Sequence, residues 1–260
     1  MTSDWDAARY SRFEDQRTRP VRDLLARAVS GGPVRTAVDA GCGPGNSTQA
    51  LAEACPDAVI AAFDNSPEMV RAARARLGAG ITVDLASVSG WTAPAPVDLI
   101  LSNAVLQWVP DHETLFPHLL NQLAPGGRLA VQMPDNLDEP VHRLIQQVAE
   151  RHMDPATRSR TAASRPERHD ARWYHQLLSP LAAVDVWRTT YYHPLAGPAA
   201  VVDWFRGAGL RPWLDALDEK ARPAFLTDYE NEIASAYPAA ADGTVLLPFP
   251  RLFIVARVAG

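Results

Sequence analysis

The sequence predicts an α/β protein with a doubly wound, mostly parallel sheet of seven strands and a helical C-terminal cap insertion. Three observations predict this fold. Short apolar runs alternate with helix-like segments over residues 34–152, a glycine-rich turn follows the first run, and the alternation stops after residue 152. Strands that are separated by helices of this length form βαβ units, and such strands pair in parallel.

Each element of the predicted core follows from its local pattern. Apolar residues at helical spacing predict a helix over residues 20–30, and Gly31, Gly32 and Pro33 end it. Period and length then predict strands at 34–40, 58–63, 81–84, 97–102 and 128–133, and helices at 47–54, 67–77, 112–123 and 140–152. We expect an N-terminal helical arm at 1–30 and a core at 31–152.

The pattern changes in the C-terminal half. Residues 153–172 are polar and arginine-rich with two prolines, which predicts a loop or a mobile lid. Residues 185–192 have strand character, residues 198–238 look helical, and the apolar run 250–258 fits an antiparallel strand at the sheet edge. The predicted boundaries are 153–245 for the cap insertion, with an edge strand near 185–192, and 246–260 for the final strand of the core.

Composition and charge exclude several classes of protein. Of the 260 residues, 47% are hydrophobic and 21% are charged, which is typical of a globular protein. The formal net charge of −5 argues against a nucleic-acid or membrane surface as partner. There are two cysteines, Cys42 and Cys55, and neither a signal peptide nor an apolar run of the roughly 20 residues of a membrane span is recognisable. We therefore expect a cytoplasmic protein.

The strongest local signal is the segment VDAGCGPGN at residues 38–46. Its glycines let the backbone turn sharply at the end of a strand and approach a ligand closely. The spacing is G-x-G-x-G after an acid, whereas nicotinamide-dependent oxidoreductases use G-x-G-x-x-G, and no phosphate-binding lysine follows. The candidate cofactor-binding residues of this turn are Asp39, Gly41, Gly43 and Gly45.

Three successive predicted strands carry a carboxylate at or near their ends. Asp39 would repel a pyrophosphate and attract the α-ammonium group of an amino acid. Asp64 lies where a carboxylate reaches the two ribose hydroxyls of a nucleoside, and Asp84 could accept from an adenine amino group. Three carboxylates without a basic phosphate clamp describe a nucleoside that carries an amino acid. S-adenosylmethionine (SAM) is such a ligand.

These segments, with residues 97–103 and the LAPGG of residues 123–127, resemble the motif series of class I SAM-dependent methyltransferases. The resemblance implies the Rossmann-like fold of that class, with SAM as cofactor and S-adenosylhomocysteine as product. It adds Asn65 and Asn103 to the candidate cofactor-binding residues. Trp5, Tyr10 and Arg19 resemble the arm that closes over SAM, with Arg19 suited to its carboxylate, although packing of a surface helix is the alternative.

A second resemblance extends over almost the whole chain and is more specific. The segments that carry it are NAVLQWVPD at 103–111, VQMPDN at 131–136, WRTTYYH at 187–193, GLRPWL at 209–214 and FPRLFIVA at 249–256. They resemble the trans-aconitate 2-methyltransferase family. This resemblance implies carboxyl O-methyl transfer from SAM to trans-aconitate, a small polycarboxylate, giving a monomethyl ester. The oligomeric state is not readable.

The implied chemistry decides which residue types to look for. A carboxylate at neutral pH is already a nucleophile, so we assign no general base, no other catalytic residue and no metal. Arginine, tyrosine, indole and amide donors should recognise the substrate. Gln107 and Trp108 are similar to the carboxylate-binding pair of plant carboxyl methyltransferases, and a turn that packs Trp108 into the core is the alternative. The other candidates for substrate binding are Arg188, Tyr191, Tyr192, His193, Arg211 and Arg251.

Not all of these candidates can contact one substrate. Strand alternation predicts one face with Arg188, Thr190 and Tyr192 and another with Thr189, Tyr191 and His193. Structural roles stay open for His193 as a hydrogen-bonded histidine, and for Arg211 and Arg251 as caps of turns beside proline. Two other functions also stay open, namely methylation of another small acid or specialised metabolite, and SAM binding without catalysis.

Overall fold

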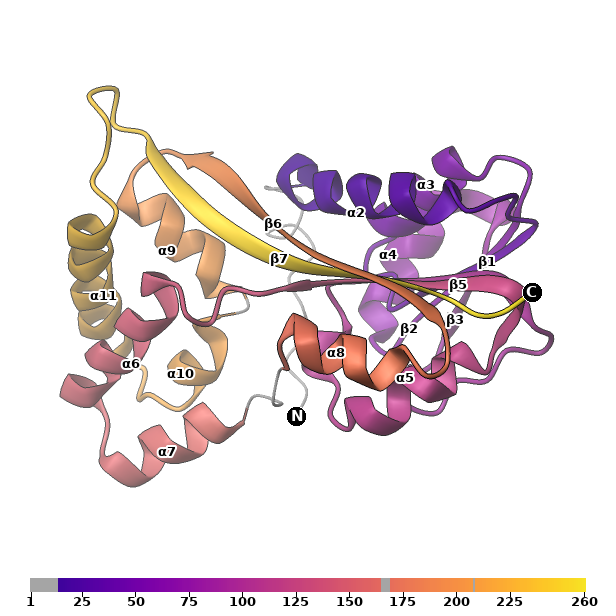
Figure 1. Ribbon diagram of the computed structural model, residues 1–260. Helices are drawn as coiled ribbons and strands as arrows, with labels where there is room; N and C mark the ends of the chain where they lie inside the picture. The colour runs from indigo at the N-terminus through magenta and orange to yellow at the C-terminus, as the bar shows by residue number, and fades with distance from the viewer. Residues whose placement is uncertain (1–13, 165–168, 208) are drawn as a thin grey trace. The chain divides into compact units, whose positions relative to one another are not determined.

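The computed structural model describes residues 14–164, 169–207 and 209–260, and its strands form one seven-stranded sheet in the order β3-β2-β1-β4-β5-β7-β6 (Figure 1). The strands are β1 (Thr36–Ala40), β2 (Val59–Asp64), β3 (Thr82–Leu85), β4 (Val97–Asn103), β5 (Leu123–Pro134), β6 (Ala183–Leu195) and β7 (Val245–Arg257). Strands β3, β2, β1, β4 and β5 pair in parallel. The predicted α/β class with a mostly parallel sheet is therefore confirmed.

Strand β7 runs antiparallel to β5. The N–H of Asp135 donates to the carbonyl of Pro250 at 2.9 Å, and the N–H of Val258 donates to the carbonyl of Gly127 at 3.0 Å. The end of β5 thus lies beside the middle of β7, and the end of β7 lies beside the first residues of β5. The antiparallel direction is as predicted, but the expected edge position is wrong, because β6 is the edge strand. Strand β7 is buried along most of its length, as an inner strand with two covered faces requires.

The chain packs into two compact units, the first within residues 1–133, 167–189 and 252–260, the second within 134–166 and 190–251. The helices of the first unit are α2 (Glu14–Val29), α3 (Asn46–Ala54), α4 (Pro67–Leu77), α5 (His112–Leu120) and α8 (Ala171–Leu178), with short 3-10 turns η1 (Gly78–Gly80) and η2 (Leu106–Trp108). Helices α2 and α3 lie on one side of the sheet, and α5 and α8 lie on the other (Figure 1).

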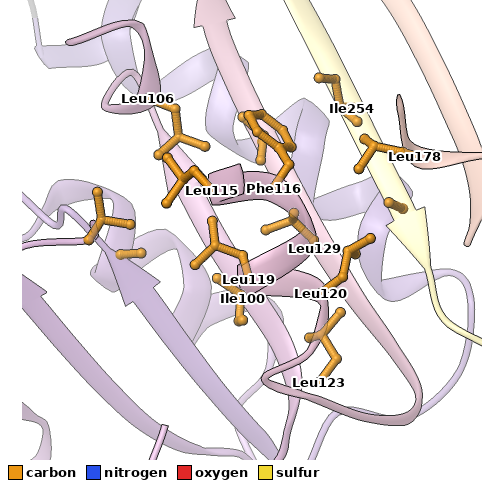
Figure 2. Packing of buried hydrophobic residues seen from close by; sticks show 14 of the residues in the cluster. Ile100, Leu106, Leu115, Phe116, Leu119, Leu120, Leu123, Leu129, Leu178 and Ile254 are labelled. Atoms are coloured by element: carbon orange, nitrogen blue, oxygen red, sulfur yellow. The ribbon is translucent and has the colours of Figure 1, made fainter. Parts of the chain in front are cut away.

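An extensive apolar cluster of the first unit lies between the sheet and the helices α5 and α8 (Figure 2). Ile100 of β4 and Leu129 of β5 contribute from the sheet, and Phe116 and Leu178 contribute from the helices. All four side chains are fully buried. Burial of a side chain of this size contributes about 1.5–3 kcal/mol, so this cluster fixes the helix that follows β4 against the sheet.

The second unit contains the helices α6 (Pro140–His152), α7 (Pro155–Ala163), α9 (Pro198–Arg206), α10 (Arg211–Asp215) and α11 (Arg222–Ala236). Helix α6 begins at the residue that the sequence predicts, and it packs on α11. There the hydroxyl of Tyr229 donates to the carbonyl of Val141 at 3.0 Å, and the N–H of Val141 donates to the hydroxyl of Tyr237 at 3.3 Å. The second compact unit starts at Pro134, before the first residue of α6.

The prediction of a loop or mobile lid over residues 153–172 is wrong for the described part of that segment. Helix α7 forms because Asp154 caps it, accepting at 3.0 Å from the N–H of Ala156 and of Thr157, and because Pro155 stands at its first turn. Asp170 caps α8 in the same way, through the N–H of Trp173 at 2.8 Å. A single capping side chain at the start of each helix thus outweighs the preference of a polar segment for a loop. No helix in the described residues is long and apolar enough to cross a membrane.

Candidate functional site

The glycine turn between β1 and α3 is shaped by two glycines with different surroundings. Gly41 has φ +83°, and a Cβ there would lie 2.4 Å from a methyl carbon of Val105, so the segment after β4 packs directly on the turn. Gly43 has φ +53°, and a Cβ there would meet nothing within 4 Å. Gly41 therefore allows the close approach of two chain segments, whereas Gly43 keeps the outer surface of the turn open to a ligand.

Asp64 joins the end of β2 to this turn. One carboxylate oxygen accepts from the N–H of Gly43 at 2.8 Å, and the other accepts from the N–H of Ser66 at 2.9 Å. A carboxylate has about four acceptor positions, so two remain for a ligand. Asn65 and Asp84 are exposed, and Asp84 of β3 pairs with Phe63 of β2 in the sheet. The acids of β2 and β3 thus lie at neighbouring strand ends, as predicted.

Asp39 is fully buried beneath the turn. One of its oxygens accepts from the hydroxyls of Ser47 and Thr48, both at 2.7 Å, and so holds the first turn of α3. Within the described residues its other oxygen has no hydrogen-bond partner. Burial raises the pKa of the Asp39 carboxyl to about 6. The hydroxyls of Ser47 and Thr48, which sequence reasoning did not single out, follow the glycines directly.

The stability of the protein should depend on pH through Asp39. Because its pKa lies above the ordinary value of 3.8, folding favours the protonated form, and this contribution to the unfolding free energy is lost as pH rises through about 6. The loss is on the order of 3 kcal/mol. Urea unfolding at several pH values should show Asp39→Asn gaining stability relative to the wild type between about pH 4 and 7. If the difference in unfolding free energy between Asp39→Asn and the wild type stayed constant over this range, it would contradict a buried carboxyl with a raised pKa.

The segment after β4 carries two candidate residues. The side-chain N–H of Gln107 donates to the carbonyl of Ala104 at 2.7 Å, which fixes which end of the amide is the oxygen. That oxygen is buried without a partner among the described residues, and so is the side-chain oxygen of Asn103. Trp108 is 41% exposed, so the alternative that packs it into the core does not hold.

Buried acceptor atoms gather in the glycine turn, the start of α3 and the segment after β4. Five buried side-chain oxygens lack any donor in the described part of the chain. Four of them lie in these three segments, one each from Asp39, Asn46, Asn103 and Gln107, and the fifth belongs to Glu68 of α4. Buried polar groups are almost always hydrogen-bonded, so these atoms fit a ligand that supplies donors. Ammonium and hydroxyl groups are donors, whereas the pyrophosphate of a dinucleotide carries no O–H to donate at neutral pH. The site therefore fits a nucleoside that carries an amino acid, as SAM does.

Strand β6 separates its candidate residues as alternation predicts. Tyr191 and His193 are buried, whereas Arg188, Thr190 and Tyr192 are exposed. The boundary between the two units falls inside this strand, so that Arg188 belongs to the first unit and the other four residues to the second.

Within the second unit the structure brings His193 and Arg251 together around aromatic rings. His193 stacks on Trp204 with 4.6 Å between ring centroids, and its ring lies 5.7 Å from that of Phe249. The guanidinium carbon of Arg251 lies 4.8 Å from the Phe249 centroid, and Arg251 is only 4% exposed. Arg211 begins α10, where its guanidinium lies 3.8 Å from the carboxylate of Asp215.

The predicted arm is described only in part. Arg19 lies on α2 and is exposed. Trp5 and Tyr10 fall outside the described residues. The cofactor role of Arg19 therefore stays a prediction, as do the roles of the other candidate residues.

Comparison with known proteins decides the family. A family model described as "Methyltransferase domain" matches residues 37–127. The trans-aconitate 2-methyltransferase of Methylobacterium nodulans is 52% identical over 256 residues, which cover 98% of both chains. That of Methylobacterium radiotolerans is 51% identical over 264 residues, covering 99% of both. The chain belongs to the trans-aconitate 2-methyltransferase family. The predicted family and enzyme class are confirmed, and the match extends through both units.

Solved structures support the same fold for this family member. The YcgJ protein of Bacillus subtilis superposes with a TM-score of 0.61 at 12% identity, covering 93% of this chain and 99% of that one. The N-methyltransferase NodS of Bradyrhizobium japonicum, in complex with S-adenosyl-L-homocysteine, gives a TM-score of 0.52 at 17% identity, covering 95% and 88%. At such identities the likeness concerns the fold alone.

Proposed function

We propose that the protein transfers a methyl group from SAM to one carboxylate of trans-aconitate and so forms a monomethyl ester. The observation that carries this proposal is the identity of 52% and 51% to two trans-aconitate 2-methyltransferases over nearly the full length of all chains. That identity includes the second unit, because the matches cover 98% and 99% of this chain. The buried acceptor oxygens and the buried Arg251 agree with it.

The residues of the first unit are proposed to bind the cofactor. Asp64 accepts from the ribose hydroxyls through the lone pairs that Gly43 and Ser66 leave open. Asp84 accepts from the adenine amino group, and the buried oxygens of Asn103 and Gln107 accept from the α-ammonium group. The cofactor supplies an electrophilic methyl group, and the carboxylate of Asp39, in its ionised form, attracts a cationic ligand.

The proposed substrate contacts are donors. In the first unit these are the indole N–H of Trp108 and the second N–H of the Gln107 amide, since the first is bound to Ala104. In the second unit they are the guanidinium of Arg251 and the hydroxyl of Tyr191. The remaining candidates are Arg188 in the first unit and Arg211, Tyr192 and His193 in the second. A trianion gains nothing from a net charge of −5, so a local guanidinium must supply the attraction.

The reaction needs orientation more than activation. A carboxylate oxygen placed about 3 Å from the methyl carbon, opposite the sulfur, can react without losing a proton. The chain therefore has to hold two partners in line and exclude water, and none of its residues has to take up a proton. Methyl-transfer assays against a panel of mono-, di- and tricarboxylic acids test the assignment. Preference for an acid other than trans-aconitate would overturn the assignment of trans-aconitate as the substrate. Methyl transfer to a carboxylate would still stand as the reaction type.

The absence of a general base predicts a flat pH profile. Between about pH 6.5 and 8.5 the rate with saturating trans-aconitate should not rise, because the substrate carboxylates are fully ionised. His193→Phe is the control, since His193 is a candidate substrate-binding residue that stacks on Trp204, and histidine is the residue type most suited to act as a general base near neutral pH. An ascending limb with a midpoint at about pH 7 that disappears in His193→Phe would contradict the base-free mechanism.

A further inference from the structure

A buried histidine links the turn that carries Gln107 and Trp108 to helix α8. His112 is 3% exposed, and both of its ring nitrogens are hydrogen-bonded. Its Nε2 lies 2.8 Å from the carbonyl oxygen of Leu106, and its Nδ1 lies 2.7 Å from the hydroxyl of Tyr174. His112 and Tyr174 are 62 positions apart in the sequence.

The direction of both hydrogen bonds follows from the chemistry of the partners. A carbonyl oxygen only accepts, so Nε2 carries the hydrogen and donates to Leu106. Burial lowers the pKa of His112, which keeps the ring neutral, and Nδ1 therefore accepts from the Tyr174 hydroxyl. Tyr174 thus fixes the tautomer of His112 that is able to hold Leu106.

The turn η2 needs such restraints because strained residues flank it. Ala104 before it and Asp111 after it both have φ +59°, a left-handed conformation that costs a non-glycine residue about 1–2 kcal/mol. Such residues persist only where their surroundings fix them. At the start of the turn the side chain of Gln107 holds Ala104. The carbonyl of Leu106, the first residue of η2, accepts both from the N–H of Val109 at 2.9 Å and from His112, which follow the turn.

We propose that His112 is a positioning residue for the methyl-transfer reaction, which holds the turn of residues 106–108 so that Gln107 and Trp108 keep their direction towards the substrate. The inference rests on the proposed function for the role of these two side chains. Tyr174 completes the arrangement from α8, the first helix after the chain returns from the second unit. Two consecutive hydrogen bonds thus join Tyr174 to His112 and His112 to Leu106, and we call this pair of hydrogen bonds the relay.

Two substitutions of His112 separate the two hydrogen bonds. His112→Gln places an amide nitrogen near the position of Nε2 and keeps the donor to Leu106, whereas His112→Asn keeps a polar group near Nδ1 and loses that donor. His112→Asn should raise the KM for trans-aconitate about tenfold and change kcat less than about threefold, because the turn loses its restraint before the substrate binds. His112→Gln should stay within about threefold of the wild-type KM.

A readout without substrate tests the relay itself. Hydrogen–deuterium exchange in residues 104–111 should become about tenfold faster in His112→Asn than in the wild type and change little in His112→Gln. Tyr174→Phe should also speed exchange there. Tyr229→Phe is the matched control, because Tyr229 is equally buried and also gives its hydroxyl to one partner, the carbonyl of Val141. That variant should lose stability without faster exchange in residues 104–111.

Unchanged exchange in His112→Asn, or an equal rise of KM in both His112 variants, would overturn the proposal. Faster exchange without any change of KM would overturn it as well, since the turn would then not position the substrate. Failure of the proposed function looks different. In that case the wild-type protein itself would transfer no methyl group to trans-aconitate, and the comparison of the His112 variants would be made with whichever acid the panel identifies.

Discussion

Replacing Arg251 by methionine should lower kcat/KM for trans-aconitate about 30- to 1000-fold, which corresponds to about 2–4 kcal/mol. The reason is the surroundings of the guanidinium. Arg251 is 4% exposed and stacks over Phe249, beside the stacked pair of His193 and Trp204. Methionine keeps most of the side-chain volume but lacks the guanidinium. A substrate carboxylate that Arg251 binds would then stay desolvated without its guanidinium partner.

Selectivity separates a substrate contact from a structural role. A monocarboxylic acid that lacks the clamped group should lose much less with Arg251→Met than trans-aconitate does. Arg128→Met is the matched control, because Arg128 is also 4% exposed but donates to the carbonyls of Ala28 and Gly32, at 3.0 Å each, in the first unit. It should lower stability and affect both acids equally. Equal losses for the two acids with Arg251→Met would show that this arginine is structural too.

Replacing Asp64 by alanine should weaken binding of S-adenosylhomocysteine about 30- to 150-fold, which corresponds to about 2–3 kcal/mol. Two effects add. The variant loses the charged acceptor for the ribose hydroxyls, and it frees the N–H of Gly43 and of Ser66, which the carboxylate now holds at 2.8 and 2.9 Å. Isothermal titration calorimetry on the purified protein measures the change directly.

Asp98→Ala is the matched control for this experiment. Asp98 likewise accepts from two backbone N–H groups, those of Arg35 at 2.8 Å and Thr36 at 3.0 Å, but it does so at the start of β4, whereas Asp64 ends β2. Its replacement should cost stability and leave the affinity for S-adenosylhomocysteine unchanged. An unchanged affinity in Asp64→Ala would remove Asp64 from the cofactor site, and an equal loss in both variants would assign the effect to folding.

The sequence by itself was enough to predict the core of the protein and its glycine turn. Helix α4 begins and ends where predicted because its signals are local, with Ser66 as cap, Pro67 in the first turn and Gly78 at the end. The glycine turn and the acids of β2 and β3 could be placed for a similar reason. Parallel strands bring their carboxyl ends to one edge of a sheet, so strand order along the chain already predicts proximity.

Only the tertiary structure decided which buried groups meet across long stretches of chain. The bond between His112 and Tyr174, the contact of His193 and Arg251 around Phe249, and the inner position of β7 join segments that no periodic pattern relates. Asp39 is an intermediate case, since its place before the glycines was visible, but its complete burial and raised pKa were not. The physical reason is that local periodicity fixes which face of an element is apolar, whereas the partner of that face depends on how the whole chain packs.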